Sequence, residues 1–203
     1  MICIYHVPVT RSHRVIWLAE ELGLEYEARK ISFRPEFRMS DEWLAKNPVG
    51  KVPALDDGEL TLFESGAMVQ YLLDRYGEGR LQPEPRTPAH AIYLQWSWFA
   101  EATFARPLGE IVNHRRNFSP EHPEIIEEMQ SRALLCVAAL DSAVRDREFL
   151  CGEFSAADIM MGYSLKLCEL LAPYSGYGAL DAYWQRLQAR PAYQRAFADY
   201  PHP

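Results

Sequence analysis

The order of strand and helix patterns in the first 76 residues constrains the fold of this chain most strongly. Short stretches in which apolar and polar residues alternate predict strands, and stretches with apolar residues at helical spacing lie between them. Gly23 ends the first helical stretch, and Asn47-Pro48 ends the second. The predicted elements are strand 2–7, helix 14–22, strand 25–33, a helix starting at 40, strands 52–55 and 59–63 joined by a turn at 56–58, and helix 65–76.

This β-α-β-α-β-β-α order is the order of thioredoxin-like domains, a topology that alone implies no function. A stretch rich in glycine and proline, residues 77–86, then interrupts both periodicities and predicts a domain boundary. Thr87-Pro88 restarts a helix as N-cap and first helical residue, and the remaining sequence has helical spacing. The predicted fold class is α/β plus all-α. The predicted domains are a thioredoxin-like domain at 1–79, a linker at 80–87 and an all-helical domain at 88–203.

One helix start in the second domain has a clear folding signal. Ser155 and Asp158 have the spacing of a capping box, in which each side chain accepts a hydrogen bond from the backbone of the other. Such a cap contributes about 1 kcal/mol, so Asp158→Ala is predicted to weaken the domain without touching chemistry directly.

Charge and cysteine content exclude several classes of function. The 203 residues include 21 Lys and Arg against 28 Asp and Glu, and the resulting net charge of -7 has the wrong sign for a nucleic acid partner. No stretch approaches the apolar length of a membrane span. The four cysteines are widely spaced, without a zinc-binding pattern, which predicts free thiols in a reducing compartment and no metal. We therefore expect a cytoplasmic protein.

The junction of the first strand and first helix is the first candidate site. In thioredoxin-like domains a reactive cysteine commonly lies here, because the helix N-terminus stabilises a thiolate. This chain has Val9-Thr10-Arg11-Ser12 instead, so its own sulfur cannot act at this position. Hydroxyl groups, backbone N–H groups and the helix dipole remain, and together these groups can stabilise a thiolate that belongs to a ligand.

Two further segments favour a peptide-like ligand. Pro53 opens a predicted strand, which leaves the backbone of Val52 able to pair with an extended ligand; the alternative is an ordinary edge-strand proline. Glu64-Ser65 precedes a predicted helix, where Ser65 and the first amides form an anion site next to a carboxylate. An amino-acid head group carries both matching charges. A plain N-cap with a solvated glutamate is the alternative.

Four motifs in the same order resemble the cytosolic glutathione transferases over essentially the whole chain. They are the segments 47–55 (NPVGKVPAL), 64–72 (ESGAMVQYL), 149–159 (FLCGEFSAADI) and 187–193 (LQARPAY). The resemblance implies that glutathione lies along Val52-Pro53, with a cis bond before Pro53 and the γ-glutamyl head at Glu64-Ser65. Lys51 would face the glycyl carboxylate, and a surface lysine is the alternative.

The resemblance leaves the catalytic hydroxyl open. Segment 10–18 looks like a bacterial and fungal variant with Ser or Thr at its first position, which favours Thr10 over Ser12. Other subgroups use a tyrosine at the end of the first strand, where Tyr5 stands, and backbone amides alone are a further alternative. Whichever group acts, each unit by which the thiol pKa falls corresponds to about 1.36 kcal/mol of thiolate stabilisation.

The implied reaction is attack of the glutathione thiolate on a small hydrophobic electrophile, with peroxidase or isomerase chemistry as related activities. An aromatic cluster in the first bundle helix is predicted to contribute to the acceptor pocket, although most of such a stripe is core. The residues assigned to that pocket are Trp96, Phe99 and Phe104. The resemblance also implies detoxification and a homodimer. A glutathione-binding or ligand-carrying protein with little turnover is the alternative function.

Overall fold

The computed structural model describes residues 1–200, and the chain divides into two compact units. The first unit contains Met1–Arg80 and the segment that begins at Arg190, and the second is Leu81–Ala189. The sequence predicts one helical domain for all residues after 87, whereas in the structure the segment that begins at Arg190 groups with the first unit. The ion pairs and aromatic contacts between this segment and the first helix account for the difference.

A four-stranded mixed sheet forms the centre of the first unit. Its strands are β1 (Ile2–His6), β2 (Tyr26–Lys30), β3 (Ala54–Asp57) and β4 (Leu60–Phe63). The order across the sheet is β2-β1-β3-β4, with β1 parallel to β2, β3 antiparallel to β1, and β4 antiparallel to β3. The predicted thioredoxin-like topology is confirmed.

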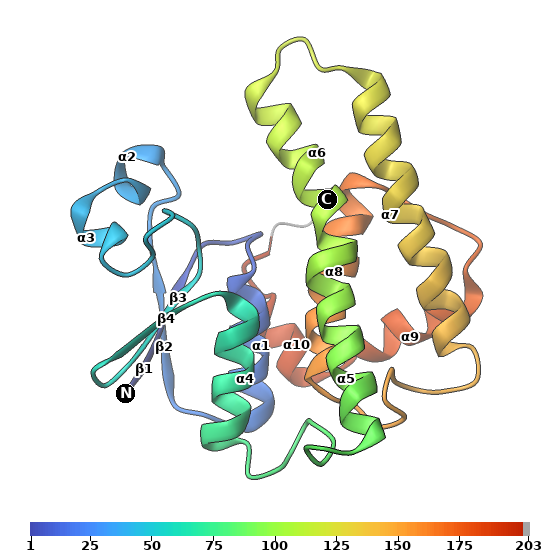
Figure 1. Ribbon diagram of the computed structural model, residues 1–203, viewed down its shortest axis with the longest axis horizontal. Coiled ribbons are helices and arrows are strands. Elements are labelled where there is room, and N and C mark those ends of the chain that lie inside the picture. Colours follow the sequence, from blue (N-terminus) through green and yellow to red (C-terminus); the bar gives the residue numbers. More distant parts are fainter. Residues whose placement is uncertain (201–203) are drawn as a thin grey trace. The chain divides into compact units, whose positions relative to one another are not determined.

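Helices cover both faces of this sheet (Figure 1). They are α1 (Ser12–Leu22), α2 (Pro35–Arg38), α3 (Asp41–Leu44), α4 (Ser65–Tyr76) and α10 (Pro191–Ala196). Successive strand residues point to opposite faces, so Tyr5 and His6 belong to different layers. Tyr5 packs in a cluster with Trp43 of α3, while the neighbouring His6 faces the layer of α1 and α10.

The hairpin between β3 and β4 differs from the prediction by about two residues. Asp56 and Asp57 belong to β3, and the turn consists of Gly58 and Glu59. A carboxylate without hydrogen-bond donors is unfavourable in a strand, but Asp56 and Asp57 both have donors here. Asp56 accepts hydrogen bonds from Lys46 and Thr61, and Asp57 accepts from two tyrosines of α4. These long-range contacts explain why the strand extends beyond the apolar residues.

The segment after Arg190 is anchored to α1 by charge pairs. The Arg190 guanidinium binds both carboxylate oxygens of Glu21, at 2.6 and 2.7 Å, and Arg195 Nε lies 2.5 Å from Glu20 Oε2. A bidentate pair of this kind fixes orientation as well as position. The indole of Trp17 also meets the ring of Tyr193 edge to face, with the centroids 5.0 Å apart.

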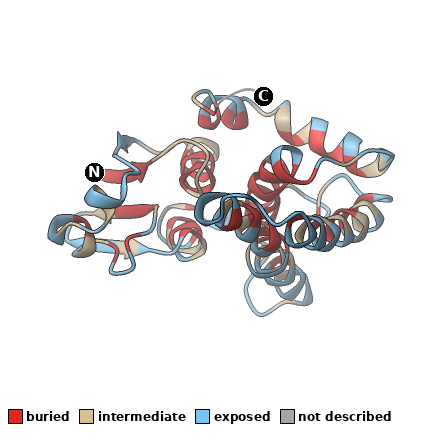
Figure 2. Cartoon of the chain, turned by 90° about the horizontal axis from the view of Figure 1, so that it is seen from above, coloured by how far each residue is buried: buried red, intermediate tan, exposed pale blue. Residues whose placement is uncertain are grey.

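The second unit is helical, as predicted. Its helices are α5 (Pro88–Trp98), η1 (Phe99–Phe104, a π-helix), α6 (Ala105–Asn117), α7 (Pro123–Val144), α8 (Ala156–Leu171) and α9 (Gly178–Gln188). Thr87 caps α5 with Pro88 as its first residue, and the capping box of Ser155 and Asp158 starts α8. Buried residues cover almost all of α8. Elsewhere in the structure most helices have buried and exposed residues on different sides (Figure 2).

The described residues contain no helix that combines the length and the apolar character needed to cross a lipid bilayer.

Gly50 is required by the close approach of two loops in the first unit. Its φ is +61°, and a Cβ at this position would lie 2.8 Å from the Arg38 carbonyl oxygen and 3.1 Å from Met39 Sδ. We expect Gly50→Ala to lower the free energy of unfolding by about 2 kcal/mol in urea titrations, because φ strain and the clash add. Gly58→Ala is the matched control, since Gly58 has φ +63° but open space around it. Equal losses in the two variants would contradict a role for the clash.

Candidate active site

Three segments that the sequence analysis selects lie at one end of the sheet. Tyr5 at the end of β1 pairs with Ala54 at the start of β3, and Ala54 pairs with Phe63 at the end of β4. The end of β1, the start of β3 and the end of β4 therefore lie side by side. Because the selected segments directly follow β1, precede β3 and follow β4, the fold brings all three together.

The first segment presents one accessible hydroxyl and one buried hydroxyl at the start of α1. Thr10 is half-buried, whereas Ser12 has no exposed surface. The two hydroxyl oxygens are 2.7 Å apart, and Thr10 Oγ1 also donates to the Val7 carbonyl oxygen at 2.7 Å. Thr10 is therefore the residue of the two that has exposed surface for a ligand. The N-terminal end of the helix adds a partial positive charge there.

The buried hydroxyl continues into a histidine that the sequence analysis does not select. Ser12 Oγ lies 2.7 Å from His6 Nδ1, and His6 Nε2 lies 3.0 Å from Asp199 Oδ2. Burial lowers the pKa of His6, and this outweighs the nearby Asp199 carboxylate, which raises it. The imidazole is therefore neutral at pH 7.

Tyr5, the third hydroxyl of the prediction, lies on the opposite face of the sheet. Its hydroxyl donates to Asp56 Oδ2 at 2.7 Å, and Lys46 Nζ approaches the same oxygen at 2.6 Å. Burial, followed by the hydrogen bond to Asp56, raises the pKa of Tyr5. The structure thus brings Thr10 and Ser12 together and does not bring Tyr5 to them.

The second segment presents a backbone edge. The Val52–Pro53 peptide bond is cis, and within the described part of the chain the backbone of Val52 has no hydrogen-bond partner. Two buried side chains hold the surrounding loop: Asn47 Nδ2 donates to the Pro53 carbonyl at 3.3 Å, and Trp43 Nε1 donates to the Lys51 carbonyl at 3.1 Å. The Lys51 side chain is exposed beside this edge.

The third segment is the start of α4. Ser65 is the buried first residue of this helix, and the exposed Glu64 before it has a φ of +73°. A non-glycine residue in this region costs of order 1–3 kcal/mol, and such strain is common at ligand sites. The fully buried guanidinium of Arg14 lies 3.5 Å from Ser65 Oγ. A helix N-terminus, a buried cation and an adjacent carboxylate suit a head group that bears both charges.

Residues 2–74, which include all three segments, match the family described as Glutathione S-transferase, N-terminal domain. Over this stretch the chain is similar to the glutathione S-transferases.

Individual relatives extend the similarity to nearly the whole chain. This chain is 26% identical over 200 residues to the probable glutathione S-transferase GSTF1 of Oryza sativa subsp. japonica, and the match covers 93% of this chain and 91% of the relative. It is 28% identical over 207 residues to the disulfide-bond oxidoreductase YfcG of Escherichia coli, covering 95% and 92%. A theta class glutathione S-transferase from Xanthomonas axonopodis pv. citri, solved with glutathione bound, is 28% identical with a TM-score of 0.84, covering 97% and 96%.

The aromatic residues predicted to line an acceptor pocket occupy different environments. Phe104, at the end of η1, is completely buried. Trp96 and Phe99 are partly exposed and contact each other edge to face, with the ring centroids 5.3 Å apart. Trp96 and Phe99 therefore have surface that a ligand could contact, whereas Phe104 has none. Their assignment to an acceptor pocket stays a prediction.

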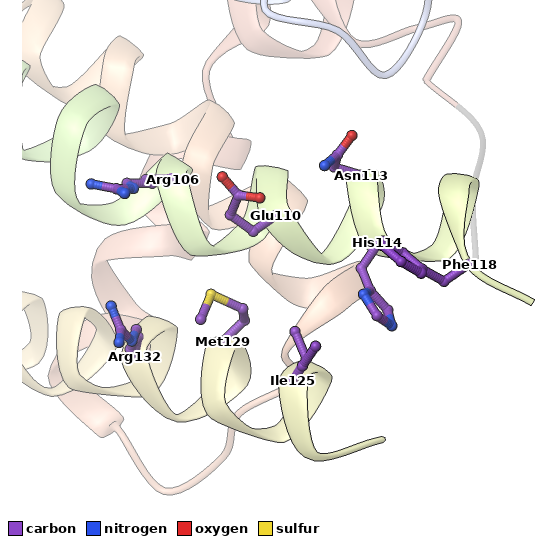
Figure 3. Close-up of a pocket in the computed structure, with 8 residues that line it drawn as sticks. All are labelled: Arg106, Glu110, Asn113, His114, Phe118, Ile125, Met129 and Arg132. Atoms are coloured by element: carbon purple, nitrogen blue, oxygen red, sulfur yellow. The ribbon is translucent and has the colours of Figure 1, made fainter. Parts of the chain in front are cut away.

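A pocket of about 280 Å³ lies elsewhere in the helical unit, between α6 and α7 (Figure 3). It is lined by Arg106, Glu110, Asn113, His114, Phe118, Ile125, Met129 and Arg132. The lining mixes charged and apolar groups, and its volume is at the lower end of ligand pockets. None of the predicted acceptor residues lines it.

One cluster in the described residues has the composition of a metal site. Ligand atoms of His6, His13 and Asp199 all lie within 4.8 Å of one another. However, the nitrogens of both imidazoles already have partners. His13 Nε2 accepts from the Val9 amide at 3.2 Å, so its Nδ1 carries the hydrogen that faces the Ala196 carbonyl at 2.8 Å. His6 lies between Ser12 and Asp199, as described above, so the cluster satisfies its own hydrogen bonds.

Four polar residues that support the candidate site were not predicted from the sequence: His6, Arg14, Asn47 and Asp199. Arg14 and His6 lie within otherwise apolar patterns of α1 and β1, and a buried polar residue in such a pattern is a usable signal. Asn47 is interpreted as a helix end, which hides its contact with Pro53. Asp199 has no local signal, because its partner is 193 positions away.

Proposed function

We propose that this chain is a glutathione transferase that binds glutathione at the three segments at one end of its sheet and activates the thiol for attack on small hydrophobic electrophiles. The observation that supports this proposal most is the position of the half-buried Thr10 just before α1, at the same end of the sheet as the backbone edge of Val52.

The tripeptide matches the three segments group by group. The γ-glutamyl carboxylate binds the start of α4 near Ser65 and Arg14, and its ammonium group pairs with Glu64. The cysteinyl backbone pairs with Val52, as a peptide does when it extends a sheet edge. Lys51 faces the glycyl carboxylate. This arrangement brings the cysteinyl sulfur to the hydroxyl of Thr10.

The reaction begins with ionisation of the sulfur. Thr10 donates a hydrogen bond to the thiolate, and the dipole of α1 adds to its stability. The thiolate then attacks the electrophilic atom of the acceptor, so that a carbon–sulfur bond forms and the displaced electron pair leaves with the departing group. Trp96 and Phe99 are proposed to contact the acceptor.

An ultraviolet difference titration with glutathione across pH tests this function directly. We expect a saturable thiolate absorption with an apparent thiol pKa one to two units below that of free glutathione, because a hydrogen bond and a helix dipole supply roughly that stabilisation. Binding detected by calorimetry without this absorption would favour a ligand-carrying protein with little turnover. If neither calorimetric binding nor thiolate absorption is detected, the proposed site is wrong.

A second candidate activity is glutathione-dependent disulfide reduction, which the similarity to disulfide-bond oxidoreductase YfcG favours. Thr10 would stabilise the same thiolate, and a disulfide sulfur would replace the electrophilic carbon. Parallel assays with an aryl halide and with a small mixed disulfide separate the two activities. The larger kcat/KM identifies the reaction to which the site is better suited.

We also propose a homodimer, a cytoplasmic location and a role in detoxification. Large apolar side chains are exposed on α5, among them Trp98 with 67% exposure, which supports an interface there. We expect sedimentation at micromolar concentration to give twice the monomer mass, and Trp98→Arg to give the monomer. Leu135→Arg on α7, at a residue with 72% exposure, is the control that leaves the dimer intact. A wild-type monomer would contradict the proposal.

A further inference from the structure

A chain of hydrogen-bonding groups crosses the first unit from the accessible Thr10 to the C-terminal segment. Thr10 Oγ1 lies 2.7 Å from Ser12 Oγ, Ser12 Oγ lies 2.7 Å from His6 Nδ1, and His6 Nε2 lies 3.0 Å from Asp199 Oδ2. The two middle members are buried, whereas the Asp199 side chain keeps 31% of its surface exposed. Both ends of the chain can therefore exchange with solvent or ligand, and its centre cannot.

Counting hydrogens gives this chain a direction in the unliganded protein. The Asp199 carboxylate can only accept, so Nε2 of the neutral His6 carries the hydrogen and Nδ1 is an acceptor. Ser12 Oγ lies closer to His6 Nδ1, at 2.7 Å, than to the Val7 carbonyl oxygen, at 3.2 Å, so its one hydrogen is donated to His6. Thr10 can direct its one hydrogen either to the Val7 carbonyl oxygen or to Ser12 Oγ, each 2.7 Å away. When the Thr10 hydrogen points to Ser12, every hydrogen can shift one step towards His6.

We propose that His6, held by Asp199, receives the proton of the glutathione thiol through Ser12 and Thr10. The inference rests on the proposed function and adds the destination of the proton. His6, Ser12 and Asp199 act through Thr10, which makes them positioning residues for the reaction.

The proton transfer balances without any further reagent. The thiol proton moves to Thr10 Oγ1, the Thr10 hydrogen moves to Ser12 Oγ, and the Ser12 hydrogen moves to His6 Nδ1. The products are a thiolate and an imidazolium. Each member of the chain then donates towards the sulfur, and the imidazolium Nε2–H donates to Asp199. After the carbon–sulfur bond forms, the Nδ1 proton returns through Ser12 and Thr10 to the departing group or to water, which restores the starting tautomer of His6.

The charged groups around His6 suit a transient positive charge. Asp199 from the C-terminal segment favours the imidazolium, and Lys30 of β2 disfavours it while pairing with the same carboxylate at 2.9 Å. His13 of α1 faces His6 edge to face at 4.9 Å, and burial lowers its pKa to about 4, so it stays neutral. The new negative charge on the sulfur raises the pKa of His6 and offsets part of its burial.

The number of protons released when glutathione binds to the wild-type protein tests this proton relay from Thr10 through Ser12 to His6. The test needs no substitution. Calorimetry of glutathione binding in buffers of different ionisation enthalpy counts the protons released, and the ultraviolet signal counts the thiolate formed. We expect clearly fewer than one proton released per thiolate, because His6 retains it. One proton per thiolate would overturn the relay.

Variants at Asp199, one end of this series of hydrogen bonds, and at Ser12, one of its middle members, give a second test. Asparagine at 199 can donate to His6 Nε2, which favours the tautomer that cannot accept from Ser12. We expect Asp199→Asn and Ser12→Ala each to raise the apparent pKa of the bound thiol by about one unit, a tenfold loss of thiolate below that pKa. Each should also bring the release to about one proton per thiolate formed. If these residues were merely structural, neither the ratio of protons released to thiolate formed nor the apparent pKa of the bound thiol would change.

Glu21→Gln is the matched control. It weakens the Arg190 pair that anchors the C-terminal segment but does not touch the relay. A thiol pKa raised equally in Glu21→Gln and Asp199→Asn would show that only the anchoring of the segment matters, and would overturn the proposal. If the wild-type protein gives no thiolate signal, the proposed function itself is wrong. If the wild-type signal is normal and Asp199→Asn and Ser12→Ala both retain it, only the relay is wrong.

Discussion

Thr10→Val is expected to lower kcat for glutathione conjugation by about 10- to 100-fold while glutathione still binds. Valine keeps the shape of threonine but removes the hydroxyl that donates to the thiolate. A hydrogen bond to a charged group is worth about 1.5–3 kcal/mol, which corresponds to that range of rates. The head-group contacts at Ser65 and the backbone edge at Val52 are untouched, so the dissociation constant should change little.

Steady-state kinetics and the ultraviolet titration check this prediction together. The variant should show a raised apparent pKa of the bound thiol, and raising the pH should recover part of the lost rate. Thr10→Ser is the control, since it restores a hydroxyl at the same position and should retain most of the activity. Wild-type turnover in Thr10→Val would contradict the assignment and leave the backbone amides of α1 as the stabilising groups.

Asp158→Ala is expected to destabilise the helical unit by about 3–5 kcal/mol, well beyond the loss of a simple helix cap. Asp158 is fully buried and accepts from the Leu150 amide at 3.0 Å, the Ser155 amide at 2.9 Å and the Tyr183 hydroxyl at 2.9 Å. Its removal leaves several buried donors without a partner, each at a cost of about 1–3 kcal/mol. For a chain of this length the melting temperature should fall by about 10 °C.

Tyr183→Phe separates the cap from the rest of this network. It removes one donor and leaves the capping box in place, so we expect a loss of only about 1 kcal/mol. Thermal unfolding followed by circular dichroism measures both variants. Similar losses for Asp158→Ala and Tyr183→Phe would contradict the view that the carboxylate joins three segments. The sequence estimate of about 1 kcal/mol considered only the Ser155 contact.

Local patterns were sufficient to predict most of the fold. The predicted order of strands and helices in the first unit is confirmed, as are the Thr87 cap and the capping box at Ser155, because apolar periodicity and capping depend on residues close in sequence. The helix α2 was not predicted, since its four residues are too few to show a period. The π-helix η1 also lay outside the prediction, because it interrupts a continuous helical pattern.

The same patterns located three short segments of the site but could not rank the three hydroxyls within it. Tyr5 and His6 are neighbours in the sequence, yet the pleat of β1 sends them to opposite faces of the sheet. The burial of Ser12 and the partial exposure of Thr10 depend on how α1 packs, and the spacing of apolar residues in the sequence does not predict this packing.

The sequence by itself determined the thioredoxin-like topology, the helical second unit and the segments around Thr10, Val52 and Ser65, because each depends on local propensity, spacing and turn chemistry. Only the tertiary structure decided that the segment after Arg190 packs with the first unit and that Asp199 reaches His6. Such a contact depends on the summed packing of α10 against α1. Because that packing joins residues far apart in the sequence, no local pattern around His6 or Asp199 predicts it.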